Sequence, residues 1–176
     1  MKYLFQSERL GFRNWVEADI PLMAAISGDP EVMRYFPAPA TPEQTRAFVH
    51  RMQKQFEDYG YCYFAADRLD NGEMIGFIGL MYQDYEAHFT PCVDIGWRLK
   101  KSVWRRGYAS EGAKACLDYA FNQLDLKTIY SVASKVNTPS IGVMQKIGMQ
   151  KDSEFQHPRL MDFERIRDCE LYRIDG

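Results

Sequence analysis

The sequence predicts an α/β domain with a mixed sheet of about seven strands and about four helices. Segments with strand-like alternation and segments with helix-like spacing follow one another, without a repeat or a low-complexity tract. An Asp-Asn-Gly turn at residues 70–72 joins two apolar segments, which is a strong hairpin signal. The length of 176 residues fits one domain, so we expect residues 1–176 to form a single one.

Local signals place the individual elements. Pro21 suits the first turn of a helix, Thr41 is a good N-cap before Pro42, and Gly148 suits a helix C-terminus. We expect helices at residues 19–27, 42–59, 107–124 and 139–147, and a short helix or turn at residues 32–36. We expect strands at residues 9–13, 61–67, 74–82, 92–99, 128–134, 149–155 and 167–174.

Charge and composition argue against several classes of function. A net charge of −2 creates no field that favours nucleic acid. No apolar run is long enough to span a membrane, and the N-terminal segment lacks a secretion signal, so we expect a cytoplasmic protein. The four cysteines have no CxxC spacing and the three histidines are isolated, so we expect reduced thiols and no metal site.

The most informative stretch is VDIGWRLKKSVWRRGYASEGA, at residues 93–113. An apolar strand ends in a basic turn, and Gly107 then opens a helix of small residues. The first amides of a helix have no intrahelical partner and the helix dipole favours an anion, so this layout predicts a pocket for a phosphorylated ligand. The alternatives are a tight turn or a solvated basic turn. No GxxxxGK[ST] or GxGxxG motif is present, which argues against nucleoside triphosphate and dinucleotide loops.

The segment WRRGYA, residues 104–109, resembles the acyl-CoA pyrophosphate loop of the GNAT N-acetyltransferases, written Q/R-x-x-G-x-G/A. DIGW upstream and NTPSIGVMQKIGM downstream resemble the adjoining elements of that family, and the likeness extends over nearly the whole chain. Trp104 stands where many members have Gln or Arg, which is typical of the RimJ/RimL-like branch. The resemblance implies a mostly antiparallel sheet that splays after the fourth predicted strand, residues 92–99.

The resemblance also implies acetyl-CoA as cosubstrate, without a metal. Its pyrophosphate is expected to lie on the loop formed by Arg105, Arg106, Gly107, Tyr108, Ala109 and Ser110. Main-chain groups of Trp97, Arg98 and Leu99 are expected to bind the pantetheine arm like an added strand, and Asn137 is expected to contact the same arm. Capping of the following helix is the alternative role for Asn137.

Asp94 is the leading candidate for the general base, because an attacking amine must lose a proton. Many relatives have Glu in this strand, and the shorter Asp favours a proton relay through water. The alternative is an Asp with a purely structural role. Ser140 is the candidate acid that protonates the leaving thiolate, because Met144 stands where many GNAT enzymes have a Tyr. Glu111, in a first helical turn, is expected to complement the helix dipole.

The acceptor is expected to be a primary amine, either a small molecule or a protein N-terminus such as that of a ribosomal protein. Aromatic residues on the acceptor side are candidates for its pocket, although aromatic residues more often belong to the core. These are Trp15, Tyr35, Phe36, Tyr82 and Tyr85, followed by His88 and Phe89. A protein substrate would fit an open groove and a small one a closed pocket; both a monomer and a homodimer are consistent with the sequence.

Two other functions fit parts of the pattern. One is a non-catalytic acyl-CoA-binding or sensor module on the same scaffold, which Met144 and Asp94 would suit because the usual Tyr and Glu are missing. The other is an interaction domain whose basic turn binds a phosphorylated partner. Fold alone does not separate these functions from acetyl transfer, because function depends on the site.

Overall fold

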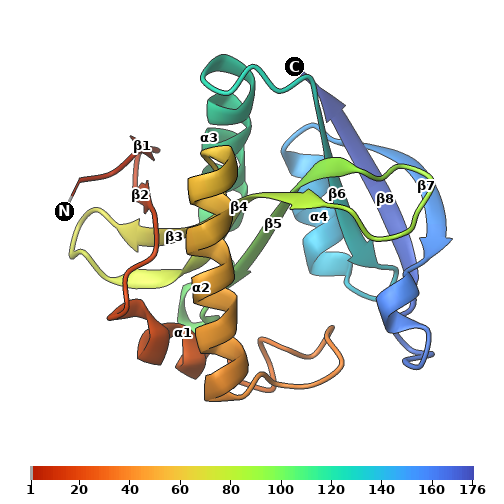
Figure 1. The fold of residues 1–176 in the computed structure, drawn as a ribbon, viewed down its shortest axis with the longest axis horizontal. Coiled ribbons are helices and arrows are strands. Elements are labelled where there is room, and N and C mark those ends of the chain that lie inside the picture. Colours follow the sequence, from red (N-terminus) through yellow and green to blue (C-terminus); the bar gives the residue numbers. More distant parts are fainter. Residues whose placement is uncertain (1) are drawn as a thin grey trace.

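The computed structural model describes residues 2–176, which form one eight-stranded sheet in the order β1-β2-β3-β4-β5-β6-β8-β7 (Figure 1). The strands are β1 (Phe5–Gln6), β2 (Leu10–Arg13), β3 (Tyr63–Arg68), β4 (Met74–Gln83), β5 (Cys92–Leu99), β6 (Thr128–Ser134), β7 (Gln150–Gln156) and β8 (Asp168–Asp175). The helices are α1 (Asp19–Ser27), α2 (Pro42–Tyr59), α3 (Tyr108–Asn122) and α4 (Thr138–Lys146), with 3-10 turns at Lys101–Val103 and Pro158–Leu160. The predicted α/β class and mixed sheet are confirmed.

The predicted elements all form, with ends that shift by one or two residues. β1 is the one strand that the sequence did not predict, because two residues are too few to show an alternating pattern. Residues 32–36, expected as a short helix or turn, form turns.

The sheet changes character between β5 and β6. Every other neighbouring pair is antiparallel, whereas β5 and β6 run parallel and share a single register pair, Asp94 with Tyr130. By contrast, β4 pairs with β5 along its whole length, from Gly76 with Leu99 to Gln83 with Cys92. Beyond Asp94 the two strands therefore diverge, and they frame an open V in Figure 1. The splay after the fourth predicted strand, residues 92–99, is confirmed.

Helices cover both faces of the first half of the sheet, with α1 and α2 on one face and α3 on the other (Figure 1). The Thr41–Gln44 capping box starts α2, and Gly60 with φ 77° ends it. On the opposite face α3 packs very closely, since a Cβ placed on Gly112 would lie 2.4 Å from the Ile78 side chain. Small residues along α3 therefore set how near the helix lies to the sheet.

A buried ion-pair cluster fixes the start of the chain to the sheet. The Arg13 guanidinium on β2 lies 2.7 Å from the carboxylates of both Asp19 on α1 and Asp67 on β3. All three side chains are buried. Each charge is therefore paired by direct hydrogen bonds, which is what makes burial of ions tolerable. In residues 2–176 no helix is both long and apolar enough to cross a membrane.

Replacing Asp67 with Ala removes one of the two carboxylates and leaves the Arg13 charge buried and half-compensated. We expect the free energy of unfolding to fall by about 3 kcal/mol in urea denaturation. The matched control is Asp58→Ala, which breaks the exposed Lys54–Asp58 pair on α2 and should change stability very little. Equal losses in the free energy of unfolding for the two substitutions would contradict the proposed contribution of the buried cluster to stability.

Candidate active site

The predicted phosphate-binding loop lies directly after β5, at the start of α3. Gly107 is the N-cap of α3 with φ 82°, a left-handed conformation that glycine adopts without strain. Arg105 also has a positive φ, 59°, so the chain makes a sharp reversal here. The first amides of α3 have no acceptor within the helix, and they lie beside the exposed Arg105 and Arg106 side chains. The loop can therefore hold an anionic group.

The side chains of this loop differ in accessibility. Tyr108 and Ser110 are buried, and the Ser110 hydroxyl donates to the Gly107 carbonyl at 3.1 Å. Ala109 is half-buried. Trp104 donates from Nε1 to the Leu99 carbonyl at 2.8 Å, which fixes the turn to the end of β5. Binding by this loop would therefore come from backbone amides and the two arginines rather than from the side chains of Tyr108 or Ser110.

Arg9 and Glu111 connect the loop to the segment between β1 and β2. The role of Arg9 was not predicted from the sequence. Glu111 Oε2 accepts from Arg9 Nε at 2.6 Å, while Oε1 accepts from the Ser7 hydroxyl at 2.7 Å and from the Arg9 backbone N–H at 2.8 Å. These bonds lower the pKa of Glu111, although burial opposes them. Arg9 also donates to the Arg106 carbonyl at 3.1 Å and lies over the Tyr108 ring. Glu111 thus has a tethering role in addition to its place near the helix dipole.

Ser140 lies at the start of α4 and is oriented by hydrogen bonds with Asn137 and with Trp97. The Asn137 side chain accepts from the Ser140 backbone N–H at 3.2 Å, so Asn137 caps α4 as its alternative role required. Trp97 on β5 donates from Nε1 to the Ser140 hydroxyl oxygen at 3.0 Å. Because the hydroxyl accepts this bond, its own hydrogen stays free to be donated. Met144, at the position of the missing Tyr, is 1% exposed and belongs to the core.

Asp94 lies on the face of β5 opposite to Trp97, because successive side chains of a strand alternate. Its carboxylate accepts from the Tyr63 hydroxyl at 2.7 Å and from Gln83 Nε2 at 2.9 Å. Burial raises the pKa of Asp94 to about 7, against the two hydrogen bonds, which lower it. A carboxylate with a pKa near neutrality is suited to exchange a proton at physiological pH.

Tyr63 and Gln83 are site residues that the sequence analysis missed. The Tyr63 ring lies over Gly96, where a Cβ would come within 3.1 Å of it, so the absence of a side chain makes room for the ring. Tyr63 also stacks on Phe77 at 4.9 Å between ring centroids. Burial is the main cause that raises the pKa of Tyr63, so its phenol remains a hydrogen-bond donor to Asp94. Residues 63 and 94 are 31 positions apart, and no local motif joins them.

The predicted acceptor residues fall into separate groups. Tyr85 follows β4 and contacts two residues of the loop after β7. Its ring centroid is 4.6 Å from that of His157 and 5.4 Å from Cζ of Arg159. Phe36 lies over the Arg98 guanidinium at 4.5 Å, next to Tyr35 on the loop between α1 and α2. Tyr82 stacks on Tyr59 of α2, with 5.1 Å between the ring centroids. The remaining predicted acceptor residues are Trp15, His88 and Phe89.

Trp15 is in the core rather than on an acceptor surface. It is 3% exposed, and its Nε1 donates to the Tyr63 carbonyl at 2.6 Å. Its side chain therefore supports β3 beneath Tyr63. Residue type alone suggested a pocket, and packing against α2 decided otherwise. His88 and Phe89 join a cluster with Phe155 on the β7 side of the V.

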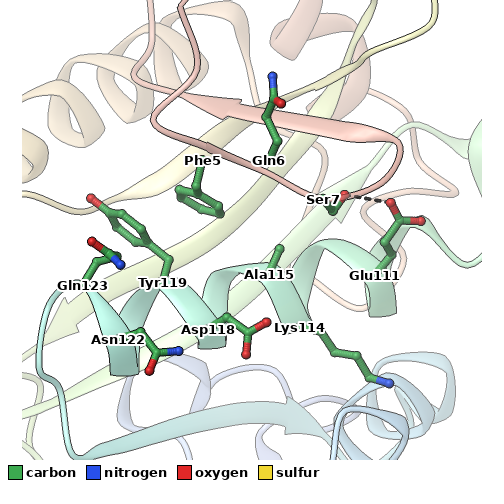
Figure 2. Close-up of a pocket in the computed structure, with 10 residues that line it drawn as sticks. All are labelled: Phe5, Gln6, Ser7, Glu111, Lys114, Ala115, Asp118, Tyr119, Asn122 and Gln123. Carbon is green, nitrogen blue, oxygen red and sulfur yellow. Dashed lines mark hydrogen bonds between the residues drawn. The ribbon is translucent and has the colours of Figure 1, made fainter.

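One surface groove lies away from these groups. It has a volume of about 440 Å³ and lies between β1 and α3 (Figure 2). Its lining consists of Phe5, Gln6, Ser7, Glu111, Lys114, Ala115, Asp118, Tyr119, Asn122 and Gln123. None of the predicted catalytic or cofactor-binding residues borders it. Within residues 2–176 no three His, Cys, Asp or Glu side chains gather as metal ligands.

Comparisons with known proteins agree with the predicted family. Residues 9–150 match the family model described as the acetyltransferase (GNAT) domain. The chain is 34% identical over 128 residues to protein YkkB of Bacillus subtilis, covering 73% of each chain. It is 30% identical over 151 residues to the N-acetyltransferase YnaD of the same organism, covering 85% of this chain and 84% of that one. A GNAT-family acetyltransferase from Bacillus anthracis superposes with a TM-score of 0.79 at 28% identity, covering 97% and 96% of the two chains.

Asp94 should make the protein less stable at alkaline pH. Its pKa is higher in the folded protein than the unfolded value of about 4. The stability that comes from the protonated carboxyl is therefore present below about pH 4 and is lost as the pH rises through about 7. The Asn side chain of Asp94→Asn cannot ionise. The free energy of unfolding of the variant minus that of the wild type should therefore increase from pH 5 to pH 8, as measured by urea denaturation. A difference that does not change with pH would contradict the raised pKa.

Proposed function

The chain belongs to the GNAT acetyltransferase family, and from this we propose that it transfers an acetyl group from acetyl-CoA to a primary amine in a ternary complex. The acceptor is a small-molecule amine or a protein N-terminal α-amine. We further assign the chain to the RimJ/RimL-like branch, on the basis of Trp104 in its WRRGYA loop. The observation that supports the proposal most strongly is the placement of Asp94 and Ser140 where β6 separates from β5. Asp94 lies on one face of β5, and Ser140 contacts Trp97 on the other face.

The loop after β5 fits the pyrophosphate of acetyl-CoA. The positive φ of Gly107 and the free amides of α3 provide donors, and Arg105 and Arg106 add positive charge. The edge of β5 from Trp97 to Leu99 has no strand partner on the β6 side, so its main-chain groups can bind the amides of the pantetheine arm. Acetyl-CoA supplies an acetyl group that is activated as a thioester.

Asp94 takes the proton that the amine loses as its nitrogen attacks the carbonyl carbon. The Asp side chain is short, so a water molecule relays this proton. Tyr63 and Gln83 both donate to the carboxylate and hold it in one orientation. An α-amine, with a pKa of about 7.7–8.0, needs less help than a lysine-like amine at about 10.4. A base with a pKa of about 7 matches the first better than the second.

Ser140 returns a proton to the sulfur when the carbon–sulfur bond breaks. Trp97 donates to its oxygen, which orients the hydroxyl and leaves its hydrogen for the leaving thiolate. Backbone N–H groups near Trp97 stabilise the negative charge that develops on the carbonyl oxygen. In balance, a carbon–nitrogen bond replaces the carbon–sulfur bond and one proton moves from nitrogen to sulfur.

Direct attack is favoured over an acyl-enzyme by the state of the nearest cysteine. Cys92 is two residues before Asp94, and burial together with the Asp94 charge raises the pKa of its thiol to about 12. A thiol with that pKa is almost entirely protonated at pH 7 and is a weak nucleophile. Cys62, Cys116 and Cys169 are buried. The amine itself is therefore the attacking group.

A non-catalytic acyl-CoA-binding module is the second candidate. The observation that favours it is Met144, which is buried in the core and cannot serve as an acid. Such a module would bind acetyl-CoA without acetylating any amine. Turnover therefore separates the two candidates, and binding alone does not.

Acetyl-CoA should raise the melting temperature of the protein. At about 100 times its Kd a ligand adds roughly 2.7 kcal/mol of stability, which corresponds to about 5–10 °C for a domain of this size. ATP and inorganic pyrophosphate, at the same concentrations, are the controls. No shift with acetyl-CoA, or equal shifts with all three compounds, would refute the proposed cofactor site and favour a phosphate-binding interaction domain.

Replacing Asp94 with Asn should lower kcat on an amine acceptor roughly 10²-fold at neutral pH. The base must be ionised to act, so wild-type activity should rise with pH through about 7. The Asn variant should lose this rise. Asp118→Asn, on the exposed side of α3, is the control for a change of one charge.

Tyr63→Phe refines the same test, because it removes one donor to Asp94 and leaves the ring. Loss of that hydrogen bond should raise the pKa of Asp94 and shift the acid limb of the pH–rate profile upward. Identical profiles for wild type, Asp94→Asn and Tyr63→Phe would remove Asp94 from the role of base.

A further inference from the structure

Arg98 is a largely buried cation without a carboxylate partner. Its Nη1 donates to the Ser27 hydroxyl at 3.1 Å, while its Nε is buried and has no hydrogen-bond partner in residues 2–176. Burial lowers the pKa of Arg98 to about 10, and no carboxylate opposes that effect. Arg13, by contrast, is buried between two carboxylates. A buried charge normally requires a counter-ion, and within residues 2–176 Arg98 has none.

Arg98 lies on the same face of β5 as Asp94, because the two residues are four positions apart on the strand. Their Cα atoms are therefore about 13 Å apart. Tyr63 lies between them, since it donates to Asp94 and stacks on Phe77, and the Phe77 ring centroid is 5.4 Å from the Arg98 guanidinium. The candidate base and the unpaired cation thus lie on one face of β5 with Tyr63 between them, on the opposite face from Ser140.

Two loops meet beside Arg98 and Tyr85. On the loop between α1 and α2, Phe36 lies over Arg98. That loop is held to the loop between β7 and β8, because Arg165 donates to the Arg34 carbonyl at 2.5 Å. The second loop also carries Arg159, which lies over the Tyr85 ring. In Figure 1 the two loops approach each other across the open end of the V. These contacts hold the two loops together near the face of β5 that carries Asp94 and Arg98.

We propose that Arg98 binds a carboxylate of the acceptor, so that the acceptor is a small molecule carrying both a primary amine and a carboxylate. This inference rests on the proposed acetyl transfer. Ser27 engages Nη1, so the opposite edge of the guanidinium, formed by Nε and Nη2, keeps two donors without a partner in residues 2–176, which match one carboxylate by two parallel hydrogen bonds once Phe36 uncovers them. Phe36 lies over that group and is 38% exposed on its loop, so the proposal requires its ring to shift when the carboxylate binds.

The test compares acceptors that differ only in charge. The probes are β-alanine, 4-aminobutyrate and 6-aminohexanoate, each beside its uncharged amide, with acetyl-CoA as donor. A hydrogen-bonded ion pair contributes about 1.5–3 kcal/mol, so the wild type should prefer the carboxylate of at least one pair by about 10- to 100-fold in kcat/KM. In Arg98→Gln that ratio should fall toward one, and Arg98→Lys should give an intermediate ratio because it keeps the charge but not the planar fork.

Ser27→Ala is the matched control. If Arg98 only anchors the end of α1, removing its hydrogen-bond acceptor should disturb the ratio as much as Arg98→Gln does, and that result would overturn the proposal. A wild type with equal kcat/KM for acid and amide, or a preference that survives in Arg98→Gln, would overturn it too. Melting temperatures of all variants check that they fold.

Binding of the same probes to the protein with CoA, measured by calorimetry, gives a readout that does not depend on turnover. Binding of a carboxylate probe that Arg98→Gln loses supports the proposal even if no probe is acetylated. Absence of such binding refutes it. A protein that binds acetyl-CoA and acetylates only the uncharged amides keeps the proposed function and loses the role of Arg98. A protein that does not bind acetyl-CoA loses the proposed function itself.

Discussion

The single register pair between β5 and β6 is the constraint on which the candidate site depends. A sheet normally satisfies the backbone groups of a strand on both edges, but β5 keeps a partner along its whole length on the β4 side alone. The free edge beyond Asp94 can accept an extended ligand in place of the missing strand. Because side chains of a strand alternate, Trp97 and its partner Ser140 lie on one side of β5 and Asp94 and Arg98 on the other.

Buried charge is treated in two different ways within this fold. The Arg13 cluster is fully paired and ties β2, α1 and β3 together, which is a structural use of buried ions. Asp94 is held by neutral donors and Arg98 by a hydroxyl and two aromatic rings, so each remains short of a counter-ion. These two residues reduce stability in the free protein, and a substrate with complementary groups would relieve that cost. Buried ionisable residues that lack a counter-ion are therefore the residues we propose for the site.

The fold and the turn at Gly107 could be predicted because their signals are local, whereas phosphate binding by that turn stays a prediction. Gly107 beside two arginines, at a strand-to-helix junction, indicates a turn within a few residues, and in the structure Gly107 is the N-cap of α3 with a positive φ. Tyr63, Gln83 and Arg9 could not be predicted, because their roles come from contacts with residues far along the chain. Trp15 shows the converse, since an aromatic residue near a site can equally well support it from the core. The roles of Asp94 and Ser140 stay predictions, now with defined neighbours.

The Arg9–Glu111 tether has a consequence for the beginning of the chain. Through this contact the turn between β1 and β2 is part of the support of the Gly107 loop, 97 residues away from Arg106 in sequence. Coupling between two equilibria is reciprocal, so whatever orders one end of the tether also orders the other. Hydrogen exchange and proteolytic nicking at the N-terminal hairpin should therefore slow when the loop is occupied. The first strands of the sheet would then report on the cofactor from a distance, without touching it.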